Sequence, residues 1–325
     1  MSNAMPLGAT TQPTRRSTAN AAGSSKIKAK KPRKQRQPSY TAEGGERPAL
    51  WARSITWVLM IAVAIYFLIP VYWLIVASTK STGDLFSTPG LWFANLNLID
   101  NIRALTEYDG GIFWRWLLNS FIYSGVGSLL MTLISVMAGY ALAVYKFRGR
   151  NVVLAAVMGS MLVPTTVLAQ PTYLLLVQLG MSNTMLGVLL PSLVYPFGVM
   201  LGFIFASQAV PVEILEAARI DGASEARTFF SISSRLLANG AVTIILFAFI
   251  GTWNSYMLPL LVLNDVKLQP ITVGLAGWNQ ASQTVPGLQT MVIVGAMISV
   301  IPVAIVFMSL QRFWKSGLAA GGVKA

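Results

Sequence analysis

Five long stretches of this chain contain no charged side chain. They run from Ser54 to Thr79, Trp116 to Tyr145, Asn151 to Val212, Leu236 to Asn264 and Leu268 to Gln311. A helix needs roughly 20 apolar residues to cross the hydrocarbon core of a bilayer, and every stretch is longer than that. Charged residues make up only 11% of the chain, against about 25% in an average soluble domain. The sequence therefore predicts an all-α membrane protein that crosses the bilayer several times.

The number of spans follows from the lengths of these stretches. As one helix, the 62 residues from Asn151 to Val212 would reach about 93 Å, roughly three hydrocarbon cores, so they must fold back. The turn-forming residues 180–184 mark the break, and the Pro, Gly, Asn and Gln residues of 268–287 indicate a loop. Six transmembrane helices are predicted, near 54–79, 116–145, 151–178, 185–207, 240–263 and 288–311.

Basic residues are distributed unequally between the loops. Twenty Lys and Arg residues fall in segments 1–53, 146–150, 208–239 and 312–325, whereas only four fall in the loops between them. Cytoplasmic loops carry the excess of Lys and Arg in membrane proteins. We therefore expect cytoplasmic N and C termini, a cytoplasmic 208–239 loop and 312–325 tail, and an extracytoplasmic 80–115 loop.

The first 53 residues are expected to form a disordered basic cytoplasmic tail, because they combine eleven Lys and Arg with Gly, Ser, Pro and Gln and show no apolar period. The tail either stays solvated and sets the topology, or binds anionic lipid headgroups. Residues 1–4 resemble a cloning remnant ahead of Met5 and are excluded from fold reasoning.

Composition also narrows the function. The chain has no Cys and no His, which excludes disulfides, thiolate nucleophiles, imidazole bases and the usual zinc sites, and no metal site is expected. No Gly-Lys pair is present for a phosphate-binding Walker A loop, and the basic residues are not interleaved with stacking aromatics as nucleic-acid binding requires. All ionisable groups lie outside the predicted spans, which argues against a proton relay. Energy for transport is expected to come from another protein.

The 208–239 loop carries the most specific pattern. Pro211 suits the start of a helix, Glu213 the first turn, and Gly222 a left-handed end. A second amphipathic helix is expected from Ala223 past Phe230, so that two short helices meet at a sharp bend. This pair either docks into the groove of a partner protein or lies on the lipid interface.

The loop resembles the EAA loop of type I ABC importer permeases, whose Glu-Ala-Ala-x-x-Asp-Gly-Ala pattern stands here at residues 216–223. The resemblance extends from about Asn119 to the end of the chain and is similar to the carbohydrate-importer branch, in particular its MalG-like member. Pro164, a further match, interrupts the third predicted span. The other matching motifs are Asn119-Ser120, residues 138–143 and 147–150, residues 196–198, Trp253-Asn254, Pro259-Leu260, residues 311–313 and 317–318, and 321–324. Ser234-Arg235 and Asn239 depart from the family's Leu-Pro and Pro.

The resemblance implies a MetI-like bundle with its type-1 core at 116–311. It further implies a non-catalytic permease in a prokaryotic plasma (inner) membrane, which pairs with a second homologous permease and two ABC ATPase subunits. An extracytoplasmic solute-binding protein would supply the carbohydrate. ATP and Mg²⁺ would bind to the ATPase, with no cofactor on this chain. The implied ATPase-coupling residues are Glu213, Glu216, Ala217, Ala218, Asp221, Gly222 and Ala223.

A substrate path is a weaker hypothesis. It rests on aromatic and amide side chains within the predicted spans, namely Gln170, Tyr173, Trp253, Asn254 and Tyr256. Such residues also form interfacial belts and bridge helices in ordinary bundles. Three alternative functions remain, namely the same architecture for another solute class, an ion-coupled secondary transporter, and an intramembrane enzyme.

Overall fold

The computed structural model describes residues 50–321, and the basic tail predicted for residues 1–53 lies almost wholly outside them. Within this range every regular element is a helix, as predicted. The first half contains α1 (Leu50–Ser78), α2 (Thr82–Ser87), α3 (Leu98–Glu107), η1 (Tyr108–Gly111), α4 (Ile112–Val144), α5 (Arg150–Ser160), α6 (Thr165–Gln178) and α7 (Met185–Ser192). The second half contains α8 (Pro196–Ala209), α9 (Val212–Ile220), α10 (Glu225–Arg227), the π-helix η2 (Thr228–Ser233), α11 (Ser234–Leu236), α12 (Ala238–Trp253), α13 (Met257–Val262), η3 (Val266–Leu268), α14 (Ile271–Ala281) and α15 (Leu288–Gly321).

Three helical stretches among the described residues are long and apolar enough to cross a membrane, and three bent pairs bring the total to six if each pair is one span. This agrees with six predicted spans, but the third and fourth are not continuous helices. The third is divided into α5 and α6, which meet at 101°, and the fourth into α7 and α8, which meet at 41°. Pro164 caps α6 and Pro196 opens α8, because a proline nitrogen cannot donate a helical hydrogen bond.

The prediction of an irregular 268–287 segment is wrong, since α14 occupies much of it. Pro270 caps this helix, and its buried residues Ile271, Val273 and Trp278 form an apolar face. A Cβ on Gly274 would overlap the indole ring of Trp116, so the glycine lets α14 approach α4 closely. Segment 80–115, expected from its charges to be an extracytoplasmic loop, contains α2, α3 and η1.

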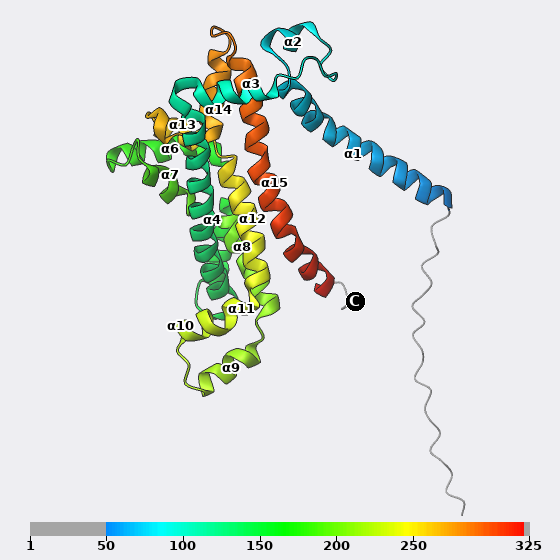
Figure 1. The fold of residues 1–325 in the computed structure, drawn as a ribbon. Coiled ribbons are helices and arrows are strands. Elements are labelled where there is room, and N and C mark those ends of the chain that lie inside the picture. Colours follow the sequence, from blue (N-terminus) through cyan, green and yellow to red (C-terminus); the bar gives the residue numbers. More distant parts are fainter. Residues whose placement is uncertain (1–49, 322–325) are drawn as a thin grey trace, which may run out of the picture. The chain divides into compact units, whose positions relative to one another are not determined.

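The bundle is built around α4, which packs along α8 and α12 (Figure 1). Small residues set the distance between α4 and α8, as the spacing of Ser135, Gly139 and Ala143 predicts. A Cβ on Gly139 would overlap the backbone of Gly202 and Phe203, and a Cβ on Gly202 would lie 2.7 Å from the Ser135 carbonyl oxygen. The two backbones are therefore in direct contact.

The Asn119-Ser120 pair holds the chain segment that leads into α14. Asn119 Nδ2 donates to the carbonyl oxygens of Lys267 and Gln269 at 2.8 and 2.9 Å, and Ser120 Oγ accepts from the Ile271 N–H at 2.8 Å. These bonds satisfy backbone groups that would otherwise be buried without partners. The motif thus has a structural role in the fold.

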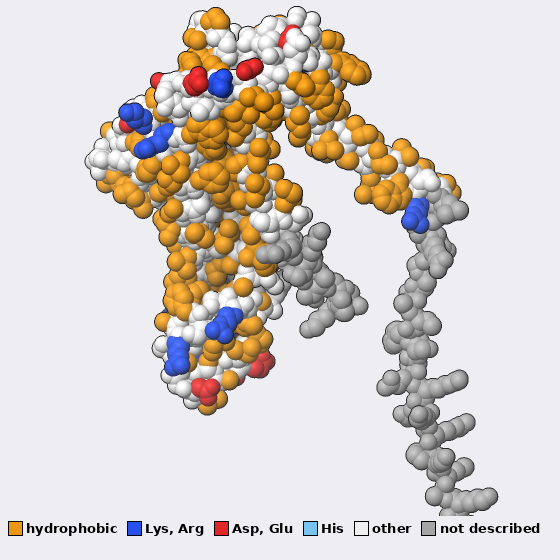
Figure 2. Space-filling model, in the orientation of Figure 1, with side chains coloured by type: hydrophobic (Ala, Val, Ile, Leu, Met, Phe, Trp, Pro, Cys, Tyr) orange, Lys and Arg blue, Asp and Glu red, His pale blue; other side chains and the backbone are white. Residues whose placement is uncertain are grey.

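Charged side chains in the visible face of the molecule gather at the two ends of the bundle, with hydrophobic side chains between them (Figure 2). One end carries α9, α10 and α11, and the other carries α3, α13 and α14 (Figure 1). This distribution fits a bundle whose middle part lies in hydrocarbon, because a charge at the centre of a bilayer is costly.

Candidate functional site

Helix α9 has one buried face and one exposed face. Leu215 and Ala218 are each 4% exposed and pack against the bundle. The opposite face presents Glu213, Glu216 and Ala217, and Ile220 is 86% exposed. Pro211 is the N-cap residue, one position before the first helical residue. An apolar side chain as exposed as Ile220, beside two carboxylates, leaves this face free to contact another molecule.

Helix α9 ends in a Schellman motif at Gly222. The Ala223 N–H donates to the Ala218 carbonyl at 2.9 Å, and the Gly222 N–H donates to the Arg219 carbonyl at 3.1 Å. Gly222 has φ of +74°, the left-handed conformation that the sequence predicts for it, whereas Asp221 precedes it as the C-cap. Ser224 then caps α10 by accepting from the Arg227 N–H. Two short helices meet at a bend, as expected.

A three-residue contact joins this bend to the end of α4. Arg219 Nε donates to Glu225 Oε1 at 2.9 Å, and the Tyr145 hydroxyl donates to Glu225 Oε2 at 2.8 Å. Tyr145 is the C-cap residue of α4. One carboxylate therefore connects α9, α10 and α4, and we call these three residues the Glu225 triad.

The pKa directions within the Glu225 triad follow from its hydrogen bonds. Donation from Arg219 and then from Tyr145 holds the pKa of the Glu225 carboxyl below its usual value. The same bond raises the pKa of Arg219. Burial, followed by the bond to Glu225, raises the pKa of Tyr145 to about 12. Both charges and the donor proton are therefore present throughout the neutral pH range.

Apolar packing reinforces this link. Leu215 of α9, Phe229 of η2 and Leu237 are buried with Tyr140 of α4 in one cluster, which we call the Tyr140 cluster. The rings of Tyr140 and Phe229 lie 5.0 Å apart. The remaining buried members are Val136, Ala206, Val210 and Ile244. The loop is thus seated on α4, α8 and α12 together.

The bend into α12 forms without the proline that is customary in the resembling family. The axes on either side of Leu237 differ by 79°. Leu237 is 2% exposed in the Tyr140 cluster, and the Ser234 hydroxyl donates to the Phe230 carbonyl at 2.7 Å. Burial of Leu237 and the π-helix η2 accompany the change of direction at Ser234-Arg235 and Asn239.

The five substrate-path residues are not brought together. Only Trp253 and Asn254 line a common cavity, of about 200 Å³, and Trp253 is itself stacked on Phe249 in the core. Tyr173 packs against a separate buried cluster around Tyr123. Gln170 and Tyr256 are exposed. The polar side chains of Thr272 and Ser299 complete the small cavity.

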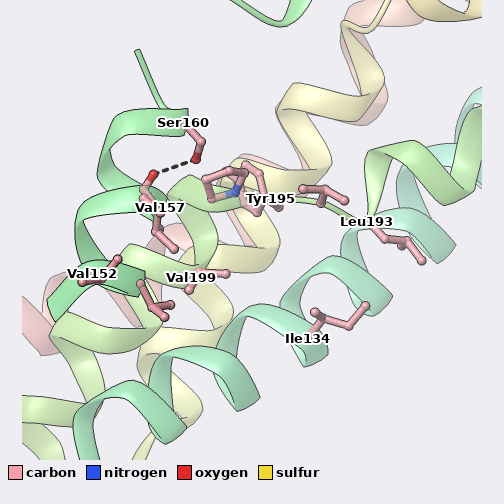
Figure 3. A pocket seen from close by; sticks show the side chains of 11 residues that line it. Ile134, Val152, Val157, Ser160, Leu193, Tyr195 and Val199 are labelled. Carbon is pink, nitrogen blue, oxygen red and sulfur yellow. Dashed lines mark hydrogen bonds between the residues drawn. The ribbon is translucent and has the colours of Figure 1, made fainter. Parts of the chain in front are cut away.

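A larger cavity, of about 610 Å³, lies between α4, α5 and α8, beside both helix breaks (Figure 3). Ile134, Val152 and Val199 project toward it, and the Ser160 hydroxyl donates instead to the Val157 carbonyl at 2.7 Å. A sugar transferred into such a lining would lose hydrogen bonds to water without replacement. This cavity is therefore a poor carbohydrate site.

These features define a multi-pass helical membrane protein with a bent, half-exposed helix pair seated on the end of its bundle. The chain belongs to the family described as the binding-protein-dependent transport system inner membrane component, whose model matches residues 131–318. It is accordingly a multi-pass protein of a prokaryotic plasma membrane. Members of this kind are permease components that work with an ATPase and a solute-binding protein.

Individual relatives agree with this assignment. The arabinooligosaccharides transport system permease protein AraQ of Bacillus subtilis (strain 168) is 31% identical over 81% of this chain and 92% of its own length. The sn-glycerol-3-phosphate transport system permease protein UgpE of Salmonella typhi is 28% identical over 80% and 93%. A bacterial ABC transporter that imports the acidic polysaccharide alginate matches in fold, with a TM-score of 0.68 and 22% identity over 81% of this chain and 98% of that one.

Sequence reasoning missed the parts of the site that come from distant segments. Tyr145 lies 80 residues from Glu225, and Thr272 lies outside every predicted span. The sequence does contain a signal for the Arg219–Glu225 ion pair, because six residues across a predicted helix bend can bring opposite charges together. No signal in a single sequence pairs Tyr145 with Glu225.

Proposed function

We propose that this chain is the permease subunit of an ATP-driven importer that moves a carbohydrate inward across the plasma membrane. The observation that carries the proposal is the α9 bend, which offers an exposed face to a partner while its other face is fixed to the bundle. The name of the AraQ relative supports the solute class, and the name of a second relative, the melibiose/raffinose/stachyose import permease protein MelC of Bacillus subtilis (strain 168), supports both the solute class and the inward direction.

In this proposal the chain pairs with a second, homologous permease, and the pair sits on two ATPase subunits, one of which binds the exposed face of α9. Both termini and this loop then lie in the cytoplasm. ATP and Mg²⁺ bind to the ATPase, and this chain catalyses no reaction. The implied contact residues are Glu213, Glu216, Ala217, Ala218 and the bend 221–223, of which Ala218 is buried and supports the exposed ones.

Coupling follows from the seating of the loop. When the ATPase dimer closes on ATP, it moves α9, and the Tyr140 cluster carries α4, α8 and α12 with it. ATP shifts the equilibrium between inward- and outward-open states only because the assembly binds ATP with different affinity in the two states. The loop is therefore the mechanical element that connects the ATPase to the transport path.

The substrate class remains part of the proposal. We retain Trp253 and Asn254 as path residues because they line one cavity with Thr272 and Ser299. The Thr272 and Ser299 hydroxyls already donate to the Ser255 and Ala296 carbonyl oxygens, so the indole ring and the Asn254 side-chain oxygen are what the cavity offers a sugar. Gln170, Tyr173 and Tyr256 are kept as outer path residues only. The UgpE relative favours a second candidate, a phosphorylated polyol carried by the same architecture.

The experiment is a measurement of ATP hydrolysis in lipid nanodiscs. The chain is co-assembled with the permease and ATPase encoded beside it, and the neighbouring binding protein is added empty, loaded with oligosaccharide, or loaded with glycerol phosphate. We expect stimulation by the oligosaccharide-loaded form. Stimulation by glycerol phosphate alone would keep the architecture and reject the sugar. If the chain instead takes up solute without an ATPase, and a protonophore abolishes this uptake, the whole proposal is rejected.

Removing the charge of Glu225 tests whether α4 moves with the loop. Glu225→Gln and Tyr145→Phe are each expected to lower stimulated hydrolysis by about twofold to fivefold, the range of an exposed ion pair. The double variant should lose little more than either single one, because both remove the same connection. The pKa of Glu225 is lowered in the folded protein, so the Glu225 contact is present at any pH above the pKa of an unfolded glutamate and is lost only in acid. The effect of each variant on hydrolysis should therefore be equal at pH 6 and pH 8. If the losses of hydrolysis in the two single variants add in the double variant, Glu225 and Tyr145 act independently and the proposed connection is contradicted.

A further inference from the structure

The loop that follows α1 exposes large apolar side chains in an ordered conformation. Its segment 85–99 contains no charged residue. Phe86 and Trp92 are each 72% exposed, Leu96 is 76% exposed and Ile99 is 81% exposed. Four such side chains within fourteen residues are unusual on a surface that faces water. Figure 2 shows hydrophobic side chains both along α1 and on the loop at its C-terminal end.

Three contacts fix this loop against the last turns of α1. The Tyr72 hydroxyl donates to the Leu91 carbonyl at 3.0 Å, and the Tyr72 ring meets the Phe93 ring edge-on at 6.4 Å. Lys80, 1% exposed, donates from Nζ to Thr88 Oγ1 at 2.9 Å and to the Pro89 carbonyl at 2.8 Å. The buried ammonium draws residues 88–89 toward the helix end and leaves the apolar side chains pointing outward.

The length of α1 indicates the depth in the bilayer at which these contacts lie. The apolar part of the helix runs over the 26 residues Arg53–Ser78, whereas a hydrocarbon core takes about 20. If Arg53 marks one boundary of the core, the other boundary falls near Trp73, about 7.5 Å before the end of the helix at Ser78. Leu91 and Phe93, which contact Tyr72, therefore lie level with the second boundary.

We propose that segment 85–99 is a membrane-interface anchor, whose Phe86, Trp92, Leu96 and Ile99 side chains insert between lipid headgroups at the C-terminal end of α1. The occupant of this surface is lipid. Trp favours the boundary between headgroups and acyl chains, the apolar side chains gain by leaving water, and no ionised group on 85–99 has to be desolvated. The apolar surface of α1 from Met60 to Trp73 continues directly into the segment.

The anchor has a mechanical consequence. Asn101 Nδ2 donates to the carbonyl oxygens of Ser78 and Lys80, both at 2.9 Å, and so ties α3 to the end of α1. The Thr82 and Thr290 hydroxyls, 2.9 Å apart, join the loop to α15. A loop held in the interface would therefore keep α1, α3 and the start of α15 at a constant depth while the rest of the bundle changes state.

The test uses the natural absence of cysteine, which makes any introduced thiol unique in this chain. Trp92→Cys, Leu96→Cys and the control Arg103→Cys, on an α3 side chain that is 74% exposed, are labelled with bimane in the assembled transporter in phosphatidylcholine/phosphatidylglycerol nanodiscs. Quenching by shallow doxyl-labelled lipid and by aqueous iodide is measured with and without the binding protein.

At positions 92 and 96 we expect lipid quenching about threefold above that at position 103, iodide quenching about threefold below it, and no response to the binding protein. Iodide quenching equal to that at Arg103→Cys would place the loop in water and overturn the proposal. Protection from both quenchers would show that another protein covers the segment. Protection from iodide only after the binding protein is added would identify that protein as the occupant, and either result overturns the lipid assignment.

Discussion

Replacing Gly222 with tryptophan is expected to reduce binding-protein-stimulated ATP hydrolysis at least about tenfold without loss of membrane insertion. Gly222 occupies the bend between α9 and α10 at φ of +74°, and a Cβ placed there meets no atom of this chain within 4 Å. A bulky side chain at this position has room within the permease itself. Tryptophan and alanine share the backbone strain of a positive φ, so a loss for tryptophan beyond that for alanine would come from what the bend contacts in another subunit.

A series at the same position separates backbone strain from contact. Gly222→Asn keeps the left-handed conformation at little cost, and Gly222→Ala adds about 1–2 kcal/mol of backbone strain without bulk. We expect hydrolysis to remain close to normal for asparagine, to fall moderately for alanine and to be lost for tryptophan. Glu216→Ala should give a similar loss, because Glu216 is exposed and makes no ion pair within residues 50–321.

Equal activities for the alanine and tryptophan variants would contradict docking at the bend, since bulk would then have no effect. Co-purification of the ATPase with each variant is the accompanying measurement. Loss of the ATPase from the tryptophan complex would indicate a broken interface, and retention with inactive hydrolysis would indicate failed coupling. Both agree with the proposal, whereas normal uptake by a well-expressed tryptophan variant would reject it.

The features predicted correctly from sequence are those whose cause is local. Uncharged length gives the spans, and the left-handed Gly222 follows from the helix that ends before it. The spacing of Ser135 and Gly139 predicts a close helix contact because residues four apart share a face. In each case the responsible residues lie within one continuous stretch of the chain.

The features that sequence missed depend on distant partners. Residues 271–281 were interpreted as a loop because Pro270 and Gly277 mark turns, but the apolar face of α14 becomes favourable only against Trp116 of α4. In the third span the interruption at Pro164 is predicted correctly, but the 101° angle between α5 and α6 depends on separate neighbours, since α5 packs on α8 and α6 packs on α13. Periodicity does not encode which surfaces are available elsewhere in the fold.

The candidate site also has a part that the sequence predicts and a part that only the structure shows. The pattern of residues 216–223 locates the loop, and the structure adds how that loop is fixed, through Tyr145 and Tyr140 of α4. The five substrate-path residues are predicted from residue type alone. Residue type does not determine position in the fold, and the structure does not bring the five together. Trp253 and Asn254, which are adjacent in sequence, line the small cavity together.

The second large effect is expected at Gly139, where α4 and α8 touch through their backbones. Gly139→Ala places a methyl group against the backbone of Gly202 and Phe203, which cannot turn aside as a side chain can, so the helices must separate. Overpacking of this kind costs about 1–3 kcal/mol, and Gly139→Leu should cost more. The measurement is the thermal unfolding midpoint in detergent, which should fall for alanine and be lost for leucine.

Gly125 provides the matched control on the same helix, because a Cβ there meets nothing within 4 Å. Gly125→Ala should leave the midpoint unchanged or raise it, since alanine favours a helix interior by about 1 kcal/mol over glycine. Gly139 also lies between Val136 and Tyr140, which both belong to the Tyr140 cluster beneath the proposed coupling loop. Separating α4 from α8 at this level should therefore uncouple hydrolysis from the binding protein even in a Gly139→Ala sample that is still folded at the assay temperature. A folded variant with normal coupling would show that α4 and α8 need not move as one body.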